Sequence, residues 1–245
     1  MRRSRILLLA VTLLACGGAP GNQVLPPPPP PGGGLKIVML GNSLTESWDI
    51  PGMVADLAVR AGAARPTVQA VTFANYSLED HWNTPASLAA VDNGDPDVVV
   101  MQQGPSTLPE SGAHLLEWSG RWAARTRAAG ARPGLYVVWP PLGGAIGNGI
   151  QHYTDAANAH QTALYPVAHA FRQLGIDHQD VPIYMPDGFH PSPHGAWLAA
   201  MIITAVIYDA DPTTFGAPFS RDITDEDAVT LRQAAKAAVT LYGRP

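Results

Sequence analysis

The chain has 245 residues, of which 46% are hydrophobic and 14% are charged, a composition typical of one globular domain with an appendage. Three of its fifteen basic residues are Arg2, Arg3 and Arg5, so the rest of the chain has 12 basic against 20 acidic side chains. Such an acidic chain offers no basic surface for nucleic acid or for anionic lipid headgroups, and we expect neither partner.

The N-terminus has the pattern of an export signal. "MRRSR" is a basic start, and "ILLLAVTLLA" is an apolar run too short to span a bilayer core of about 30 Å. The run ends in "LLAC", whose Cys16 is the only cysteine of the chain. This end resembles the lipobox of a bacterial lipoprotein signal. The resemblance implies a signal peptide over residues 1–16 and lipid on Cys16.

We therefore expect an exported bacterial lipoprotein, held through Cys16 at the outer membrane or at the periplasmic or extracellular face. The membrane would be a partner through this lipid anchor only. A plain signal peptide with an incidental cysteine is the alternative. With no second cysteine there is no intrachain disulfide, so core packing alone must stabilise the domain.

Residues 17–34, "GGAPGNQVLPPPPPPGGG", have the composition of a linker. Pro26–Pro31 favour an extended polyproline helix, and the flanking glycines provide flexible joints. A ligand for an SH3-type domain is the competing interpretation, but an exported bacterial protein rarely meets such a partner. The remaining residues, 35–245, are enough for one sizeable core and form the predicted catalytic domain.

Within this domain, apolar and β-branched runs alternate with stretches of helical character. The runs predict strands at Leu35–Leu40, Pro66–Phe73, Asp97–Gln102, Pro133–Trp139 and Val181–Met185. Helices are predicted at Pro51–Ala61, Thr84–Val91, Gly112–Ala129, Tyr153–Leu174, His194–Asp209 and Asp222–Tyr242. Alternating strands and helices, with nearly continuously apolar strands, indicate a three-layer α/β/α sandwich around a mainly parallel sheet of about five strands. Sites form at the carboxyl ends of strands in such sheets.

Ser43 stands at one of these strand ends, in "KIVMLGNSLTES". One interpretation is structural, because Ser43 and Glu46 have the spacing of a helix capping box. The other is catalytic. A serine hydroxyl becomes a nucleophile only where a base takes its proton and a further group orients that base.

The candidate base lies in the turn-rich segment "MPDGFHPSPHGAWLAA". Asp187 precedes His190 by three residues, so its carboxylate can fold back on the imidazole, while Pro191 keeps the segment a loop. The i, i+4 spacing of His190 and His194 is also that of a metal site, but Pro191 and Pro193 disrupt the helical face that such a site requires. We expect no metal.

Three segments, "GNSLTES", "VVVMQQGPS" and "DGFHPSPHG", occur in the expected order and resemble the SGNH, or GDSL-like, esterase family, and the resemblance covers Leu35 to about Tyr242. It implies a serine hydrolase without cofactor, in which Ser43 is the nucleophile, His190 the base and Asp187 its support. The expected substrate is an ester of an acetyl or other short acyl group, with deacetylation of a carbohydrate and hydrolysis of lipid or simple short-chain esters as the competing interpretations. The alternatives are an inactive carbohydrate-binding module and a structural envelope lipoprotein.

The chain departs from the family pattern at three positions. Asn42 stands where the family has aspartate, and no glycine follows the second strand, where Asn75 is the best candidate for a backbone donor because asparagine tolerates positive φ. Gln102 replaces the asparagine that follows the third strand. The resemblance therefore implies an oxyanion hole made by the N–H of Ser43, the N–H near Asn75 and the amide of Gln102, each such donor being worth about 3–4 kcal/mol of barrier.

The remaining histidines and the tryptophans have structural interpretations. We expect His81, in "EDHW", to be packed or to line the substrate site rather than to catalyse. Core filling is the favoured interpretation for most of the tryptophans, with a sugar-binding platform as the alternative; the residues concerned are Trp82, Trp118, Trp122 and Trp139.

Overall fold

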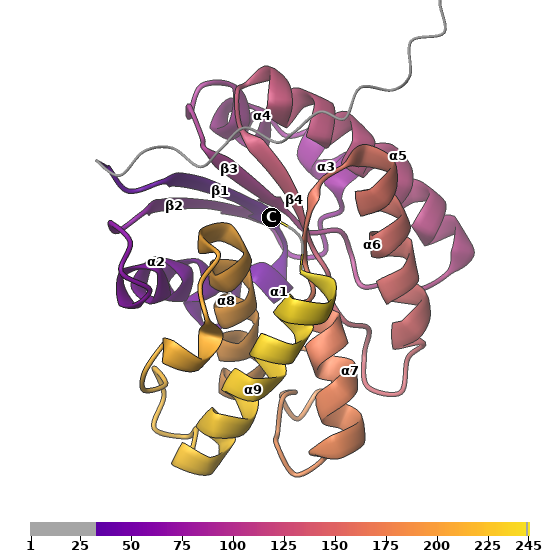
Figure 1. Cartoon of the computed structure of the whole chain (residues 1–245). Coiled ribbons are helices and arrows are strands. Elements are labelled where there is room, and N and C mark those ends of the chain that lie inside the picture. The colour runs from indigo at the N-terminus through magenta and orange to yellow at the C-terminus, as the bar shows by residue number, and fades with distance from the viewer. Residues whose placement is uncertain (1–32, 244) are drawn as a thin grey trace, which may run out of the picture.

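A computed structural model describes residues 33–243 and residue 245, which form a five-stranded sheet between two layers of helices (Figure 1). Cys16 and the predicted signal peptide lie outside the described residues, as does most of the linker. The strands are β1 (Lys36–Gly41), β2 (Thr67–Thr72), β3 (Val98–Met101), β4 (Arg132–Tyr136) and β5 (Ala163–Tyr165). All pairings are parallel, and the order is β2-β1-β3-β4-β5. The predicted three-layer fold with about five parallel strands is confirmed.

Helices cover both faces of this sheet. They are α1 (Ser43–Glu46), α2 (Ile50–Arg60), α3 (Leu78–Trp82), α4 (Pro85–Asp92), α5 (Pro109–Ala128), α6 (Ile146–His160), α7 (Val167–Asp177), α8 (Pro193–Tyr208) and α9 (Asp225–Tyr242), with short 3₁₀ turns η1 (Ser47–Asp49) and η2 (Pro212–Thr214). One face carries α3 to α6, and the other carries α2, α7, α8 and α9 (Figure 1). Because both faces are covered, β3 is buried throughout and β1 is exposed only at Lys36.

Helix α8 is the most deeply buried helix of the described chain. Every residue from Pro193 to Ile207 is buried, because α8 lies against the sheet beneath α2, α7 and α9. Helix α9 is amphipathic and begins at the N-cap Thr224, followed by three acidic residues that suit the positive end of the helix dipole, as predicted. No helix among the described residues is long and apolar enough to cross a membrane.

Two sequence-based expectations are wrong. The predicted helix Tyr153–Leu174 is interrupted: α6 ends before Gln161, whose φ of 52° is left-handed, and β5 follows. Pro166 then separates β5 from α7, since proline cannot continue a helix from the residues before it. The predicted strand Val181–Met185 does not join the sheet. It pairs back on the segment after it, through Met185 N–H to the His190 carbonyl (2.8 Å) and a bridge between Tyr184 and Pro191.

Candidate active site

Ser43 follows β1 directly and occupies the first position of α1. The N-cap of α1 is Asn42, whose Oδ1 accepts a hydrogen bond from Leu44 N–H at 3.1 Å. The structural interpretation, in which Ser43 itself caps the helix, is therefore wrong. With the cap supplied by Asn42, the Ser43 hydroxyl is available to another partner.

That partner is His190, whose Nε2 lies 3.1 Å from Ser43 Oγ. Its Nδ1 lies 2.7 Å from Asp187 Oδ2, so the three predicted side chains form one continuous chain of hydrogen bonds. Because a carboxylate only accepts, Nδ1 carries the proton and Nε2 is left to accept the Ser43 O–H. The hydrogen bond from His190 and those from nearby backbone N–H groups hold the pKa of Asp187 below its usual value, so the carboxyl stays ionised.

Asp187 also organises the loop that carries it. Its Oδ1 accepts from the N–H groups of Phe189 (2.9 Å) and His190 (3.0 Å), which closes a tight turn around the carboxylate. Gly188 has a φ of 67°, a conformation that glycine adopts without strain. The sequence "DGFH" therefore sets the orientation of the imidazole relative to its own loop.

Gln102 is buried against residues 41–45, the turn that carries Ser43 and is called the nucleophile turn below. It has no exposed surface, and its Oε1 accepts from Asn42 N–H and from Thr45 Oγ1–H, both at 2.9 Å. Its amide nitrogen donates to the Gln103 carbonyl. The expected oxyanion role of Gln102 does not fit this placement, because the amide is turned to backbone and the carbonyl supports the turn. Gly41 is required here, since a Cβ would lie 2.7 Å from Gln102 Oε1.

The loop that carries Asn75 lies beside the nucleophile turn. Asn42 Nδ2 donates to the Tyr76 carbonyl at 3.1 Å, and Phe73 N–H donates to the Gly41 carbonyl at 3.3 Å. Asn75 has a φ of 63°, the left-handed conformation expected of it. The Ser43 N–H stands at the first helical position, where an α-helix offers no internal acceptor. These two backbone donors are the oxyanion candidates that the geometry leaves.

His81 supports the turn from below. It has no exposed surface, and its ring nitrogens contact the Gly41 carbonyl (2.9 Å) and Ser87 Oγ (2.8 Å). Burial lowers the pKa of His81, so its imidazole is neutral and serves as a donor to Gly41 and an acceptor from Ser87. Of the two expected placements, packed or lining the substrate site, the structure shows the packed one.

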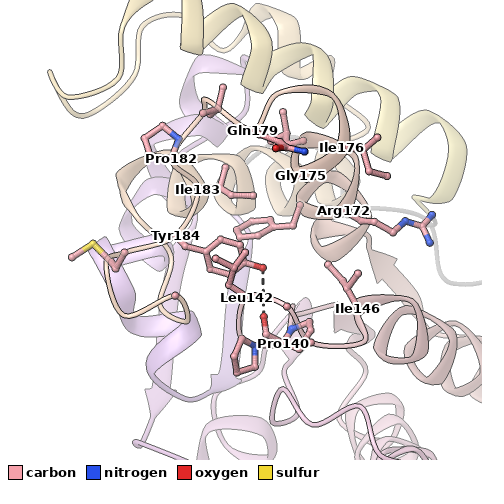
Figure 2. A pocket seen from close by; sticks show the side chains of 18 of the residues that line it. Pro140, Leu142, Ile146, Arg172, Gly175, Ile176, Gln179, Pro182, Ile183 and Tyr184 are labelled. Atoms are coloured by element: carbon pink, nitrogen blue, oxygen red, sulfur yellow. Dashed lines mark hydrogen bonds between the residues drawn. The ribbon is translucent and has the colours of Figure 1, made fainter.

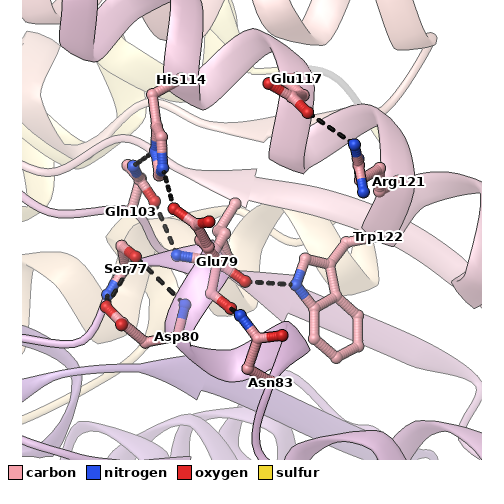
Figure 3. A network of polar contacts seen from close by, with 10 residues as sticks. Ser77, Glu79, Asp80, Asn83, Gln103, His114, Glu117, Arg121 and Trp122 are labelled. Atoms are coloured by element: carbon pink, nitrogen blue, oxygen red, sulfur yellow. Dashed lines mark hydrogen bonds and ion pairs between the residues drawn. The ribbon is translucent and has the colours of Figure 1, made fainter.

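A polar network that the sequence gave no reason to expect holds the start of α3 (Figure 3). Gln103 Oε1 accepts from Leu78 N–H at 2.7 Å, which fixes the orientation of this amide. Its Nε2 therefore faces His114 Nδ1 (2.7 Å), and His114 Nε2 contacts Glu79 Oε2 at 2.8 Å. Since α3 begins two residues after Tyr76, the network supports the Asn75 loop from its C-terminal side.

The other histidine of the turn-rich segment has a different environment. His194 is buried in α8 and contacts Asp227 of α9 at 3.2 Å, so it does not face the same partner as His190. The part of the chain that the structure describes contains no group of three or more histidine, cysteine, aspartate or glutamate side chains that could hold a metal ion. Most of the tryptophans in question are core residues: Trp118, Trp122 and Trp139 are buried.

A cavity of about 720 Å³ adjoins the loop of Asp187, since the neighbouring Pro186 and Gly188 line it (Figure 2). Segments 140–146 and 178–188 and helix α7 line it, with Leu142, Ile146 and Ile183 among the apolar side chains. Tyr184 donates to the Pro140 carbonyl across it at 3.4 Å. Gly188 lines this cavity, whereas Ser43 and His190 do not. The site of Ser43 and His190 therefore lies outside this cavity.

No family model matches the chain, and no curated protein matches it in sequence. Among solved structures, a protein from Slackia heliotrinireducens assigned to the SGNH hydrolases is 30% identical; the match covers 70% of this chain and 97% of that protein, with a TM-score of 0.61. The chain belongs to the SGNH hydrolases. The predicted family is confirmed, and with it an enzyme of the GDSL-like hydrolase class that acts on esters.

More distant structures share the SGNH fold. A DUF4886 family protein from Bacteroides uniformis is 16% identical, with a TM-score of 0.70 over 85% of this chain and 95% of that protein. A lipase/acylhydrolase from Enterococcus faecalis is also 16% identical, with a TM-score of 0.56 over 76% of this chain and 99% of that protein. These two likenesses concern the fold alone.

Proposed function

We propose that this SGNH hydrolase removes short, acetyl-sized acyl groups from a carbohydrate through a covalent intermediate on Ser43. The observation that carries the proposal is the chain of hydrogen bonds from Ser43 Oγ through His190 to Asp187, with distances of 3.1 and 2.7 Å. A nucleophile, a base and an orienting carboxylate within this reach are what acyl transfer requires. An inactive binding module or a structural lipoprotein gives no reason for the three groups to meet.

The reaction follows from this geometry. His190 Nε2 takes the Ser43 proton as Oγ attacks the ester carbonyl, and the N–H groups of Ser43 and Asn75 stabilise the oxyanion. The imidazolium, paired with Asp187, then gives the proton to the departing alcohol, which leaves an acyl group on Ser43. Water, deprotonated by His190, attacks this acyl-enzyme in turn, and the carboxylic acid departs as Ser43 recovers its proton.

Two features support the substrate class. Neither Ser43 nor His190 lines the apolar cavity of about 720 Å³, so this cavity does not hold a long acyl chain bound to the nucleophile. Two exposed aromatic residues lie on segments that are hydrogen-bonded to the site: Trp48, which donates to Pro191, is 43% exposed, and Phe73, which donates to Gly41, is 38% exposed. Exposed aromatic side chains on these segments offer apolar surface on which a sugar ring can pack.

A panel of p-nitrophenyl esters of graded chain length, together with acetylated oligosaccharides, tests this function. We expect kcat/KM to be highest for acetyl esters, to fall with acyl length, and to be higher still on the acetylated sugar. Ser43→Ala should abolish turnover on every substrate. Activity that survives in Ser43→Ala would disprove the mechanism, and a preference for long acyl chains would disprove the substrate class.

We also propose that Cys16 carries a lipid anchor, which the "LLAC" sequence and the linker at 17–34 support. Gly17 after the cysteine gives no retention signal for the inner membrane, so the outer membrane is the expected site. Cys16→Ser should move the protein from the membrane fraction to the soluble fraction and abolish incorporation of labelled palmitate. Retention of the variant in the membrane would disprove the anchor.

A further inference from the structure

The backbone on either side of His190 is held by two tryptophan side chains. Trp139 Nε1–H donates to the carbonyl of Phe189 at 3.0 Å, and Trp48 Nε1–H donates to the carbonyl of Pro191 at 2.8 Å. These carbonyls belong to the residues immediately before and after His190. The two indoles come from different parts of the fold, since Trp139 follows β4 and Trp48 follows α1.

Trp139 is a rigid donor. It is fully buried, and its ring stacks on Phe171 of α7 with a centroid distance of 3.7 Å and an interplanar angle of 7°. Tyr136 contacts it at a steeper angle, with centroids 6.4 Å apart. A close-packed core leaves such a side chain little freedom, so Trp139 fixes the Phe189 carbonyl relative to the sheet.

The position of Trp48 is fixed by its backbone conformation and not by burial. It is 43% exposed and has a φ of 55°, and the next residue, Asp49, has a φ of 56°. Two consecutive non-glycine residues in the left-handed region are strained, and such strain persists where the surroundings determine it. Hydrogen bonds on both sides do so here: Ser47 Oγ donates to the Ser43 carbonyl (2.6 Å), and Asp49 Oδ1 accepts from Gly52 N–H (3.1 Å).

The two indole donors can fix a distance that Asp187 does not fix. Asp187 and His190 share one loop, so their hydrogen bonds orient the imidazole within that loop but do not fix its distance from Ser43. Trp48 lies in the turn that follows Ser43 and reaches across to Pro191, so it links the nucleophile and the base directly. Trp139 links the same loop to the sheet from the other side.

We propose that Trp48 and Trp139 are positioning residues that hold the His190 imidazole in register with Ser43 during proton transfer. The proposal rests on the function proposed above. If the two indoles act in this way, loss of either N–H should impair proton transfer by His190 more than substrate binding. The reason is that the two N–H groups bind the backbone of the His190 loop and not the ester.

The test compares two acetyl esters that differ in their need for a proton. The p-nitrophenolate group departs unprotonated, whereas an alkoxide of ordinary basicity must receive a proton from His190 as it leaves. Trp48→Phe and Trp139→Phe keep an aromatic ring and remove the N–H donor. We expect kcat/KM for ethyl acetate to fall roughly 10-fold more than kcat/KM for p-nitrophenyl acetate, with KM nearly unchanged.

The control is Trp118→Phe, which changes a tryptophan of α5 that is 8% exposed and lies far along the chain from the His190 loop. It should leave the ratio of the two esters at the wild-type value. If Trp139→Phe does not fold, the exposed Trp48 carries the test alone. Equal losses on both esters, or no loss, in Trp48→Phe would overturn the positioning role. That failure is distinct from failure of the proposed function, which activity in Ser43→Ala would reveal.

Discussion

The side-chain amide of Asn42 donates to the carbonyl of Tyr76 at 3.1 Å. Its other end caps α1 through Leu44 N–H, so one side chain joins the nucleophile turn to the loop of Asn75. An ionised aspartate, the residue that the GDSL pattern has at this position, could accept from Leu44 but could not donate to Tyr76. The asparagine is therefore matched to the loop that this chain places beside the nucleophile.

Asn42→Asp should lower both stability and activity. The Tyr76 carbonyl would lose its donor and face a buried carboxylate, and we expect a loss of about 1–3 kcal/mol in the free energy of unfolding. The kcat/KM on p-nitrophenyl acetate should fall as the Asn75 loop moves. Urea unfolding and the esterase assay measure the two effects. Asn83→Asp is the matched control, because the exposed Asn83 amide also donates to a backbone carbonyl, that of Glu79 within α3, and makes no link to the loop of Asn75. A fully stable and active Asn42→Asp would show that the link is dispensable.

Gln102→Ala should lower stability together with kcat. Asn42 N–H and the Thr45 hydroxyl would lose their buried acceptor, at a cost of about 1–3 kcal/mol each. Thr45→Val removes one of the two donors and should cause a smaller loss of the same kind. Chemical denaturation and steady-state kinetics, measured together, distinguish a supporting role of Gln102 from a role as oxyanion donor. A Gln102→Ala enzyme that loses kcat about 100-fold at unchanged stability would restore the oxyanion role.

Asp187→Asn should lower kcat by about 10⁴-fold with little change in KM. The asparagine keeps an acceptor for the N–H groups of Phe189 and His190, but an amide NH₂ can face His190 Nδ1 only if that nitrogen has lost its proton. The imidazole would then hold its proton on Nε2 and could not accept one from Ser43. Asp180→Asn, an exposed change seven residues earlier in the chain, is the control. A loss below 10-fold would show that Asp187 acts only as a turn residue.

Folding stability should fall in acid through buried histidines. Burial, with a smaller effect of Arg172, lowers the pKa of His169 from 6.5 to about 4. The unfolded chain therefore binds a proton that the folded chain excludes, and the stability present above pH 6.5 is lost as the pH falls towards 4. For His169 the loss is about 3 kcal/mol at most. Urea unfolding between pH 4 and 8 measures it, and His169→Gln should flatten the curve.

The exposed His178, at the end of the same helix, provides the control for that experiment. His178→Gln should leave the pH dependence of the wild-type protein intact. The direction of the His81 shift is the same, so a residual decline in acid is expected in His169→Gln. A decline as steep as that of the wild type in His169→Gln would contradict the assignment.

The sequence allowed the central part of the fold and the candidate site to be predicted, for identifiable reasons. Continuous apolar runs mark β1 and β3 because both of their faces are covered, and "DGFH" contains its own turn. The three-residue β5 could not be separated from the helical patterns around it, although Pro166 was a signal against one continuous helix. The sequence between Val181 and Met185 is apolar because it packs under the catalytic loop, not because it joins the sheet.

The contacts that hold the site were beyond prediction for a different reason. Trp48 and Pro191 are 143 residues apart in the chain, and Asn42 and Gln102 are 60 apart. No local pattern records such pairs, because each depends on how two segments far apart in the chain meet in space. Gln102 shows the consequence: its type and position suggested a donor for the oxyanion, and only its surroundings show that its carbonyl end supports the turn.

The parallel direction of β1 determines which way the site faces. The chain enters the sheet at Leu35 and Lys36, whereas Ser43 follows the other end of the strand, six residues or about 20 Å further on. Strand β2 is parallel to β1 and brings the Asn75 loop to that same edge, and the hydrogen bond between His190 and Ser43 places His190 there too. If Cys16 carries the proposed lipid, the tether joins the domain at the entry edge, so Ser43 lies at the edge opposite the point of attachment.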